Sequence, residues 1–349
     1  MVLGMKGQGM KSSNIGGQAV LEGVMMKNKD TYAVAVRKPD GEIHVDVQEE
    51  NLPPFVKTCK KIPILRGVVS FVDSLVIGMK TLTYSASFYE EEEGGDTAKE
   101  KSGEAAKEES DMAAQGQQGS LSTAATIGTV ALSIVLAVII FFLIPYGISL
   151  LFGKVITSVT LLALLEGLIR MVIFIVYVVA ISLMEDIRRV YMYHGAEHKC
   201  INCIESGREL TVENVRESTR FHKRCGTSFL LIVMIVTILV FALIRADSAI
   251  LRLVLRLLLI PVIAGISYEF IRLAGNTDNG LVNLLSLPGL WLQRITTKEP
   301  DDSMIEVGIA SVEAVFDWKE YLAQNASSSG NASSPENAPI VNDTGETTP

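Results

Sequence analysis

Hydrophobic residues gather along this chain in blocks about as long as a bilayer is thick. A transmembrane helix needs about 20 mostly apolar residues, and the chain offers such blocks at 124–152, 159–184, 227–244 and 249–273. The first block carries no charged side chain. We therefore predict a mainly α-helical polytopic membrane protein with about four transmembrane helices, whose main partner is the lipid bilayer.

The chain before these blocks follows a different period. Between residues 31 and 48, apolar and polar side chains alternate on both sides of the turn sequence Pro39-Asp40-Gly41, which is typical of a β-hairpin. We predict that residues 14–60 form a small N-terminal β-rich unit. The N-terminus lacks the apolar stretch of a signal peptide, so we expect this unit in the cytoplasm.

Residues 61–89 are largely apolar but carry Arg66, Asp73 and Lys80. Three charges make a simple membrane crossing costly. We therefore predict an amphipathic or membrane-associated helix that lies on the membrane surface.

Two segments are predicted to be disordered from their composition. Residues 90–122 are rich in glutamate and small polar residues and should form an acidic linker. Residues 323–349 are a low-complexity tail of Asn, Ser, Pro and Thr. Between them we place a membrane domain at 123–280.

The segment that follows the membrane domain, 281–322, is predicted to lie at the membrane interface. Its first part is apolar but short, is interrupted at Pro288-Gly289, and contains Trp291 as an interfacial anchor. Its second part has the apolar spacing of an amphipathic helix.

The loops between the apolar blocks set the expected orientation. The connection 186–226 holds eight Lys or Arg residues, whereas 153–158 holds one. The positive-inside rule places the long connection, and with it both termini, in the cytoplasm. We expect a multi-pass protein of the cell membrane.

Composition excludes some functions. Hydrophobic residues make up 48% of the chain and charged residues 20%, and most of the net charge of −8 comes from the acidic linker. There is no basic stripe with interleaved aromatic residues, so we expect no nucleic-acid partner. Neither a G-x-x-x-x-G-K-[ST] nor a G-x-G-x-x-G sequence is present, so we expect no nucleotide cofactor.

The candidate chemistry lies in the 186–226 connection, where His194-Gly195-Ala196-Glu197-His198 forms an H-x-x-E-H sequence. On a helix, positions i and i+4 share a face, so His194 and His198 can reach one metal ion. Glu197 can then act as a general base on a water that the metal activates. We predict a divalent metal, most simply zinc.

A metal site needs at least a third protein ligand. His222 and Cys225 return to the same depth of the membrane boundary and are the leading candidates. Further candidates are Cys200, Cys203, Glu22 and Glu269. If both cysteines of the Cys200-x-x-Cys203 pair joined the two histidines, the site would be a closed structural one.

Several blocks of this chain resemble the domain-of-unknown-function 1385 family, the YqhQ-like bacterial membrane proteins. They are GGQAVLEGVMM, YHGAEHK, ELTVENVRESTRFHKRCGTSF and LPGLWLQRITTKEPDD, in the order of the family. The resemblance implies a multi-span membrane protein that is often labelled a metal-dependent enzyme. Family motif blocks contain Glu22, His194, Glu197, His198, His222 and Cys225, whereas Cys200 departs from the family pattern.

The leading hypothesis is a membrane-embedded, metal-dependent hydrolase that acts at the cytoplasmic membrane face on a peptide bond or a lipid-linked group. One alternative is a non-catalytic scaffold or regulator with a structural zinc site. Another is a transporter that uses Glu166, Arg170 and Glu269, and four spans would need a homodimer to build its path. Glu166 and Arg170 are also spaced to pair with each other on one helix face.

Overall fold

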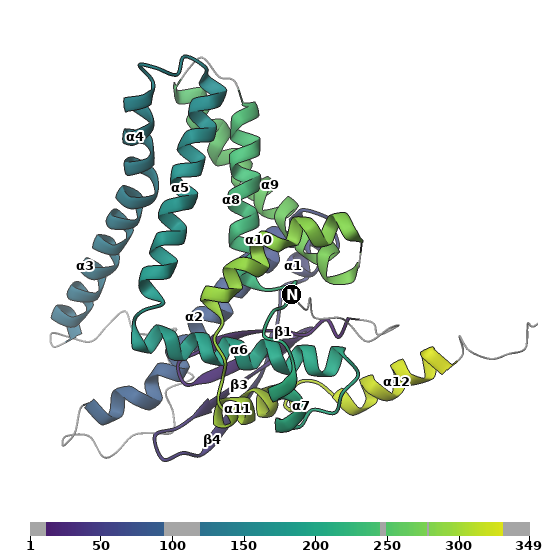
Figure 1. Ribbon diagram of the computed structural model, residues 1–349. Helices are drawn as coiled ribbons and strands as arrows, with labels where there is room; N and C mark the ends of the chain where they lie inside the picture. Colours follow the sequence, from purple (N-terminus) through teal and green to yellow (C-terminus); the bar gives the residue numbers. More distant parts are fainter. Residues whose placement is uncertain (1–11, 94–118, 245–248, 278, 331–349) are drawn as a thin grey trace, which may run out of the picture.

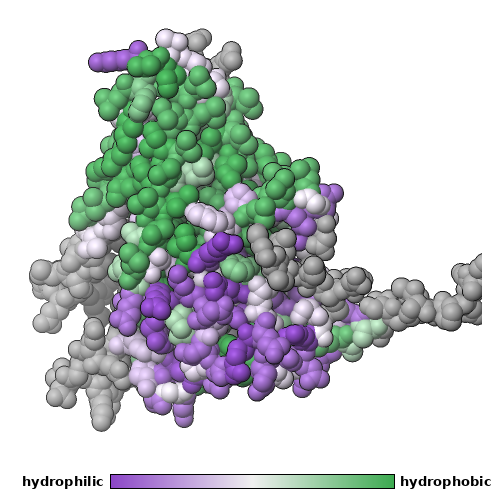
Figure 2. Space-filling model, in the orientation of Figure 1, coloured by the Kyte–Doolittle hydropathy of each residue, from purple (hydrophilic) through white to green (hydrophobic). Residues whose placement is uncertain are grey.

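The computed structural model describes residues 12–93, 119–244, 249–277 and 279–330. Apolar helices form an upper layer, and a sheet with its covering helices forms a lower one (Figure 1). The upper layer exposes hydrophobic residues almost throughout, and the lower layer is mostly hydrophilic (Figure 2).

The upper layer contains the four long apolar helices that the sequence predicts. They are Ala131–Phe152, Val159–Ile181, Gly226–Leu243 and Leu258–Asn276, and each is long and apolar enough to cross a membrane. The first runs through α3 (Gly119–Val138), the π-helix η1 (Ile139–Leu143) and α4 (Ile144–Phe152). The others are α5 (Val159–Ile181), α8 (Gly226–Leu243) and the larger part of α9 (Ala249–Asn276).

One charged pair lies inside this layer. Arg170 donates to Glu166 at 2.8 Å, as their spacing predicts. The same guanidinium donates to the carbonyl of Phe141 at 2.9 Å. Because a π-turn displaces carbonyls from the regular helical ladder, the arginine supplies a donor where η1 disturbs the first span.

The predicted β-rich unit is a four-stranded antiparallel sheet in the order β1-β2-β3-β4. Its strands are β1 (Gly16–Val20), β2 (Gly23–Asn28), β3 (Thr31–Arg37) and β4 (Ile43–Glu49). The predicted hairpin is β3–β4, and its turn contains Gly41 at a φ of 89°. A residue without a Cβ adopts this left-handed conformation at no steric cost.

Helices cover both faces of the sheet. On one face, Val20, Met25 and Val34 pack with Ile77 of α2 (Leu65–Glu93). On the other face, Val24 and the neighbouring inward-facing residues pack against α6 (Glu185–Glu205) and α11 (Asp302–Glu313). The two faces are distinct because side chains alternate along a strand.

The helix predicted at 61–89 is present as α2, preceded by the short α1 (Pro54–Cys59). Its role differs from a helix that only lies on a membrane, because Ile77 is buried against the sheet. Two of its charges are paired within the protein: Asp73 accepts from Lys27 at 2.8 Å and from Lys60 at 3.1 Å, and Arg66 pairs with Glu269.

Two segments differ from the prediction. The 186–226 connection is a folded unit containing α6 and α7 (Val212–Glu217), rather than a loop. The predicted break at Pro288-Gly289 is wrong, because α10 (Gly280–Thr296) continues through it. A Cβ on Gly289 would lie 2.7 Å from Cβ of Ser228, so this glycine allows α10 to pack closely on α8.

The predicted disordered segments are only partly described. The last helix, α12 (Trp318–Gly330), enters the range predicted as a disordered tail, and 331–349 lie outside the described residues. Likewise α2 ends at Glu93 and α3 begins at Gly119, and 94–118 of the acidic linker lie outside the described residues.

Candidate metal centre

The H-x-x-E-H sequence lies in the middle of α6. Glu185 and Asp186 occupy the first turn of this helix, where negative side chains favour the helix dipole. One turn of helix separates His194 from His198, and their ring centroids are 4.4 Å apart. The two imidazoles therefore project from one face, as the spacing predicts.

Cys225 joins these two histidines from a distant part of the chain. It is the N-cap residue of α8, and its Sγ lies 3.2 Å from Nε2 of His194. One ligand atom each from His194, His198 and Cys225 lie within 4.8 Å of one another. The structure thus brings together three of the predicted metal-ligating residues.

Backbone carbonyls orient both imidazoles. Nδ1 of His194 lies 2.8 Å from the carbonyl oxygen of Thr296, and Nδ1 of His198 lies 2.6 Å from that of Arg220. Because a carbonyl only accepts, each Nδ1 carries a proton, so Nε2 is the ring atom of each histidine that can bind a metal. A second-shell hydrogen bond of this kind is usual for histidines that bind metals.

Gly195 lets the chain after α10 cross α6 at this point. A Cβ on Gly195 would lie 2.0 Å from the carbonyl oxygen of Lys298. The backbone N–H of Lys298 donates to the carbonyl of Tyr191 at 2.8 Å. The glycine inside the motif therefore allows the end of α10, with Thr296, to reach His194.

Glu197 lies beside the three ligand residues and is 4% exposed. One of its carboxylate oxygens is 3.9 Å from Nε2 of His194. Burial raises the pKa of Glu197, although the two histidines and the backbone N–H of Gly17, which donates to the carboxylate, act against this. A carboxylate with a raised pKa is suited to accept a proton near neutral pH.

Gly17 contacts the candidate site, and the sequence reasoning did not identify this position. A Cβ there would lie 2.9 Å from Cγ of Glu197 and 2.6 Å from the carbonyl oxygen of Met25. The signal available in the sequence was a Gly-Gly pair at the start of a strand, since glycine in a strand often marks a close approach.

The electrostatics of the centre favour a thiolate. Burial alone would raise the pKa of Cys225, but His194 and His198 outweigh it and hold this pKa well below the ordinary value. The N-terminus of α8 acts in the same direction. Burial likewise opposes the charged form of His194, but Cys225 and Glu197 raise the pKa of His194 to about 9.

This donor set fits a divalent metal. A proton held between Nε2 of His194 and Sγ of Cys225 occupies the place that a cation would take, and metal binding displaces such protons. Two imidazole nitrogens and one thiolate are typical zinc ligands, and three protein ligands leave a fourth position open. The hydroxyl of Thr227 adds a hydrogen-bond partner for the sulfur at 3.1 Å.

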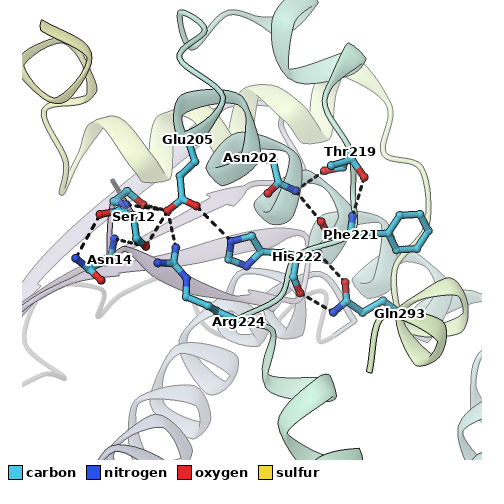
Figure 3. Close-up of polar contacts among 10 residues, drawn as sticks. Ser12, Asn14, Asn202, Glu205, Thr219, Phe221, His222, Arg224 and Gln293 are labelled. Carbon is cyan, nitrogen blue, oxygen red and sulfur yellow. Dashed lines mark hydrogen bonds and ion pairs between the residues drawn. The ribbon is translucent and has the colours of Figure 1, made fainter. Parts of the chain in front are cut away.

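His222, the other leading candidate, belongs to a neighbouring cluster (Figure 3). Its Nε2 lies 3.8 Å from a carboxylate oxygen of Glu205, and its ring centroid is 5.6 Å from that of His198. Gln293 holds the backbone of His222 on both sides, by accepting from its N–H at 2.9 Å and donating to its carbonyl at 2.7 Å. His222 is therefore not part of the ligand group.

Glu205 is the centre of this second cluster. One of its oxygens accepts from the backbone N–H and the hydroxyl of Ser13, each at 2.8 Å, and from Arg224 at 2.7 Å. Burial opposes ionisation, but His222 and Arg224 outweigh it and lower the pKa of Glu205. Burial and the nearby Arg224 lower the pKa of His222 to about 4. The cluster therefore consists of an ionised glutamate, its arginine and a neutral histidine.

Cys200 and Cys203 face away from the metal centre. Sγ of Cys200 lies 3.0 Å from the position of a Cβ on Gly308 in α11, and Cys203 donates to the carbonyl of Glu209 at 3.3 Å. Burial raises the pKa of both thiols, that of Cys203 to about 11. The structure does not arrange a closed site of two histidines with these two cysteines.

The two remaining candidates, Glu22 and Glu269, also lie elsewhere. Glu22 occupies the β1–β2 turn and pairs through both oxygens with Arg189 at 2.5 Å. Glu269 pairs with Arg66 of α2 rather than with Arg272, its neighbour on α9. Glu22 joins the sheet to α6 and Glu269 joins α9 to α2, and neither belongs to the ligand group.

Comparisons with known proteins place the chain among uncharacterised relatives. A family model described as "Protein of unknown function (DUF1385)" matches residues 62–318. The chain is 37% identical over 318 residues to the uncharacterised protein YqhQ of Bacillus subtilis (strain 168), and the match covers 90% of this chain and 96% of that protein. No solved structure matches the chain significantly.

Proposed function

The chain belongs to the DUF1385 family of proteins of unknown function, and we propose that it is a membrane-embedded, metal-dependent hydrolase. The observation that carries this proposal is the meeting of His194, His198 and Cys225 within 4.8 Å, beside the buried carboxylate of Glu197. Three ligands with an open position and an adjacent base are the usual parts of a catalytic zinc site.

Each residue of the centre has a separate role in the proposed reaction. His194 and His198 offer Nε2 and Cys225 offers its thiolate, while the carbonyls of Thr296 and Arg220 keep the imidazoles in the required tautomer. A divalent ion held there would lower the pKa of a water molecule and polarise the bond to be cleaved. Glu197 would take the proton from that water and pass it to the leaving group.

The centre is proposed to lie at the cytoplasmic face of the cell membrane. Cys225 directly precedes the apolar helix Gly226–Leu243, so the centre lies where that helix would leave the bilayer. The basic residues of 186–226 favour the cytoplasmic side for this end, with both termini there. The expected substrate is a peptide bond near the membrane surface or a lipid-linked group, because either can reach this depth.

The test is the metal content of the full chain purified in detergent after zinc was offered. We expect about one zinc per chain in the wild type, as for a single site of three protein ligands. His194→Ala with His198→Ala, and Cys225→Ser, should lose it, whereas Glu197→Gln should keep it. Cys203→Ser is the matched control for the thiol and should keep zinc. A well-folded wild type without metal would overturn the proposal.

A structural zinc site is a second candidate function. The ligands and their hydrogen-bond partners tie together α6, the start of α8 and the end of α10, which are far apart in the sequence. A scaffold of this kind predicts that Glu197→Gln keeps zinc, fold and cellular function. A hydrolase predicts that the same variant keeps zinc and fold but loses cellular function.

The transporter hypothesis has less support. Glu166 pairs with Arg170 on α5, and Glu269 of α9 pairs with Arg66 of α2. The three residues thus belong to two separate ion pairs rather than to one path.

A further inference from the structure

Helix α10 presents apolar side chains to the outside and several polar ones to the protein. Its buried face carries Ser286, Gln293 and Thr296 beside Leu290 and Leu292. Its outward face is an apolar stripe with the spacing of one helix side, and the exposed fractions are Leu281 64%, Leu284 60%, Leu285 52% and Trp291 48%. A soluble helix directs its apolar stripe inward.

The position of α10 indicates what covers this stripe. The helix crosses the base of α8, between the apolar upper layer and the polar lower layer (Figures 1 and 2). Lys223 donates to Asn283 at 3.0 Å, and Gly289 packs on Ser228, so the helix is fixed on the protein. A half-exposed tryptophan at this level is typical of the membrane–water interface.

We propose that α10 lies in the membrane–water interface with its apolar stripe in lipid, and that this contact holds the metal centre in its binding geometry. Interfacial helices bury such a stripe about 5–10 Å into the boundary between headgroups and acyl chains. Lipid thus replaces the protein core that an apolar stripe would otherwise need.

Polar side chains on the buried face of α10 provide the coupling to the metal centre. The carbonyl of Thr296 orients His194, and its hydroxyl lies 3.2 Å from that of Thr227, which contacts Cys225. Gln293 donates to Ser228 in the first turn of α8 at 2.7 Å and also holds His222. Displacing α10 therefore disturbs the partners of two of the three ligands. This second part rests on the proposed metal site.

The two tryptophans of the chain allow a direct test of the lipid contact. Trp291 lies on α10, whereas Trp318 begins α12 in the polar layer and donates to Glu313 at 3.2 Å. The full chain is placed in vesicles of brominated phosphatidylcholine as Trp318→Phe or as Trp291→Phe, so that each variant keeps one fluorophore. We expect bromines near the headgroup to quench Trp291 strongly and Trp318 weakly. Equal, weak quenching of the two would overturn the proposal, including where a second copy covers the stripe.

The coupling is tested by zinc affinity in the same membranes. Leu284→Ala with Leu285→Ala should weaken zinc binding by about 10-fold, the lower end of what loss of an outer-shell partner costs. Leu132→Ala with Leu136→Ala removes equally exposed leucines from α3 and should leave affinity unchanged. If both pairs weaken binding equally, or if neither does, the coupling is wrong.

The two proposals can fail separately. A wild type that binds no zinc would overturn the metal site and the coupling that rests on it, while the quenching result would still decide whether α10 lies in lipid. Zinc binding together with an unquenched Trp291 would keep the metal site and overturn the role of α10.

Discussion

Helix α6 contributes to two buried clusters that both contain histidine. They differ in whether ligand atoms remain available for a metal. In the metal centre, His194, His198 and Cys225 each keep a donor atom that faces the other two. In the second cluster, Glu205 already accepts from Ser13 and Arg224 (Figure 3). The first cluster has unused ligand capacity, whereas the carboxylate of the second is paired with Arg224. Closeness of histidines alone does not make a metal site.

The largest expected effect distinguishes His198 of the metal centre from His222 of the second cluster. His198→Ala should abolish zinc binding, a loss beyond the roughly 10- to 100-fold that follows from removing an outer-shell partner. His222→Ala should keep zinc, because His222 faces Glu205. Calorimetric titration of the purified chain with zinc measures both. Equal loss in the two variants would place His222 among the ligands.

Removing the carboxylate of the second cluster should destabilise the fold. Glu205→Gln leaves Arg224 buried without its anion, and breaking a buried pair in this way costs about 3–5 kcal/mol. Denaturant unfolding in detergent measures the change. Glu313→Gln, which removes an exposed carboxylate on α11, is the control and should leave the free energy of unfolding nearly unchanged.

Glu205→Gln also allows a test by pH. The pKa of Glu205 is lowered in the folded protein, so its stabilisation is present above the ordinary glutamate value of about 4.3 and is lost as the pH falls below it. The stability difference between wild type and Glu205→Gln should therefore shrink in acid. A difference that grows towards low pH would contradict an ionised Glu205.

His222 should make the free energy of unfolding depend on pH as well. Its pKa is lowered to about 4, below the ordinary value of about 6.5. The unfolded chain then binds the proton first, so the free energy of unfolding should fall as the pH drops from about 6.5 towards 4. His222→Gln should flatten this slope, and His44→Gln, on the exposed strand β4, should keep it. Thermal unfolding across this range checks the sign.

The smallest expected effect concerns the hydroxyl beside the thiolate. Thr227→Val removes a hydrogen-bond partner of Cys225 and should weaken zinc binding by about 10-fold. Thr237→Val is the matched control, because Thr237 donates only to a carbonyl of its own helix. Equal zinc affinities of the two variants would show that the Thr227 hydroxyl does not support zinc binding.

Periodicity predicted the parts of the fold that depend on local pattern. The four apolar helices follow from length and hydropathy, and the β3–β4 hairpin follows from alternation around Gly41. The continuity of α10 through Pro288 could not be predicted, because it depends on the packing of Gly289 against Ser228. Tertiary contact overrides the local preference of proline to interrupt a helix.

The metal centre, too, could be predicted from the sequence only in part. Helical spacing alone pairs His194 with His198, but choosing between His222 and Cys225 requires knowing that Glu205 and Gln293 engage His222. Such partners come from distant segments, and no spacing rule reports them. For the same reason spacing could not predict that Glu269 pairs with Arg66, which lies about 200 positions away in the sequence.

We propose that one thiolate and two imidazoles hold the metal. Zinc K-edge X-ray absorption of the zinc-loaded full chain tests it most directly, because sulfur and nitrogen ligands give different distances, about 2.3 Å and about 2.0 Å. We predict a first shell with one sulfur and with nitrogen or oxygen atoms for the rest. Two sulfurs, or none, would contradict it.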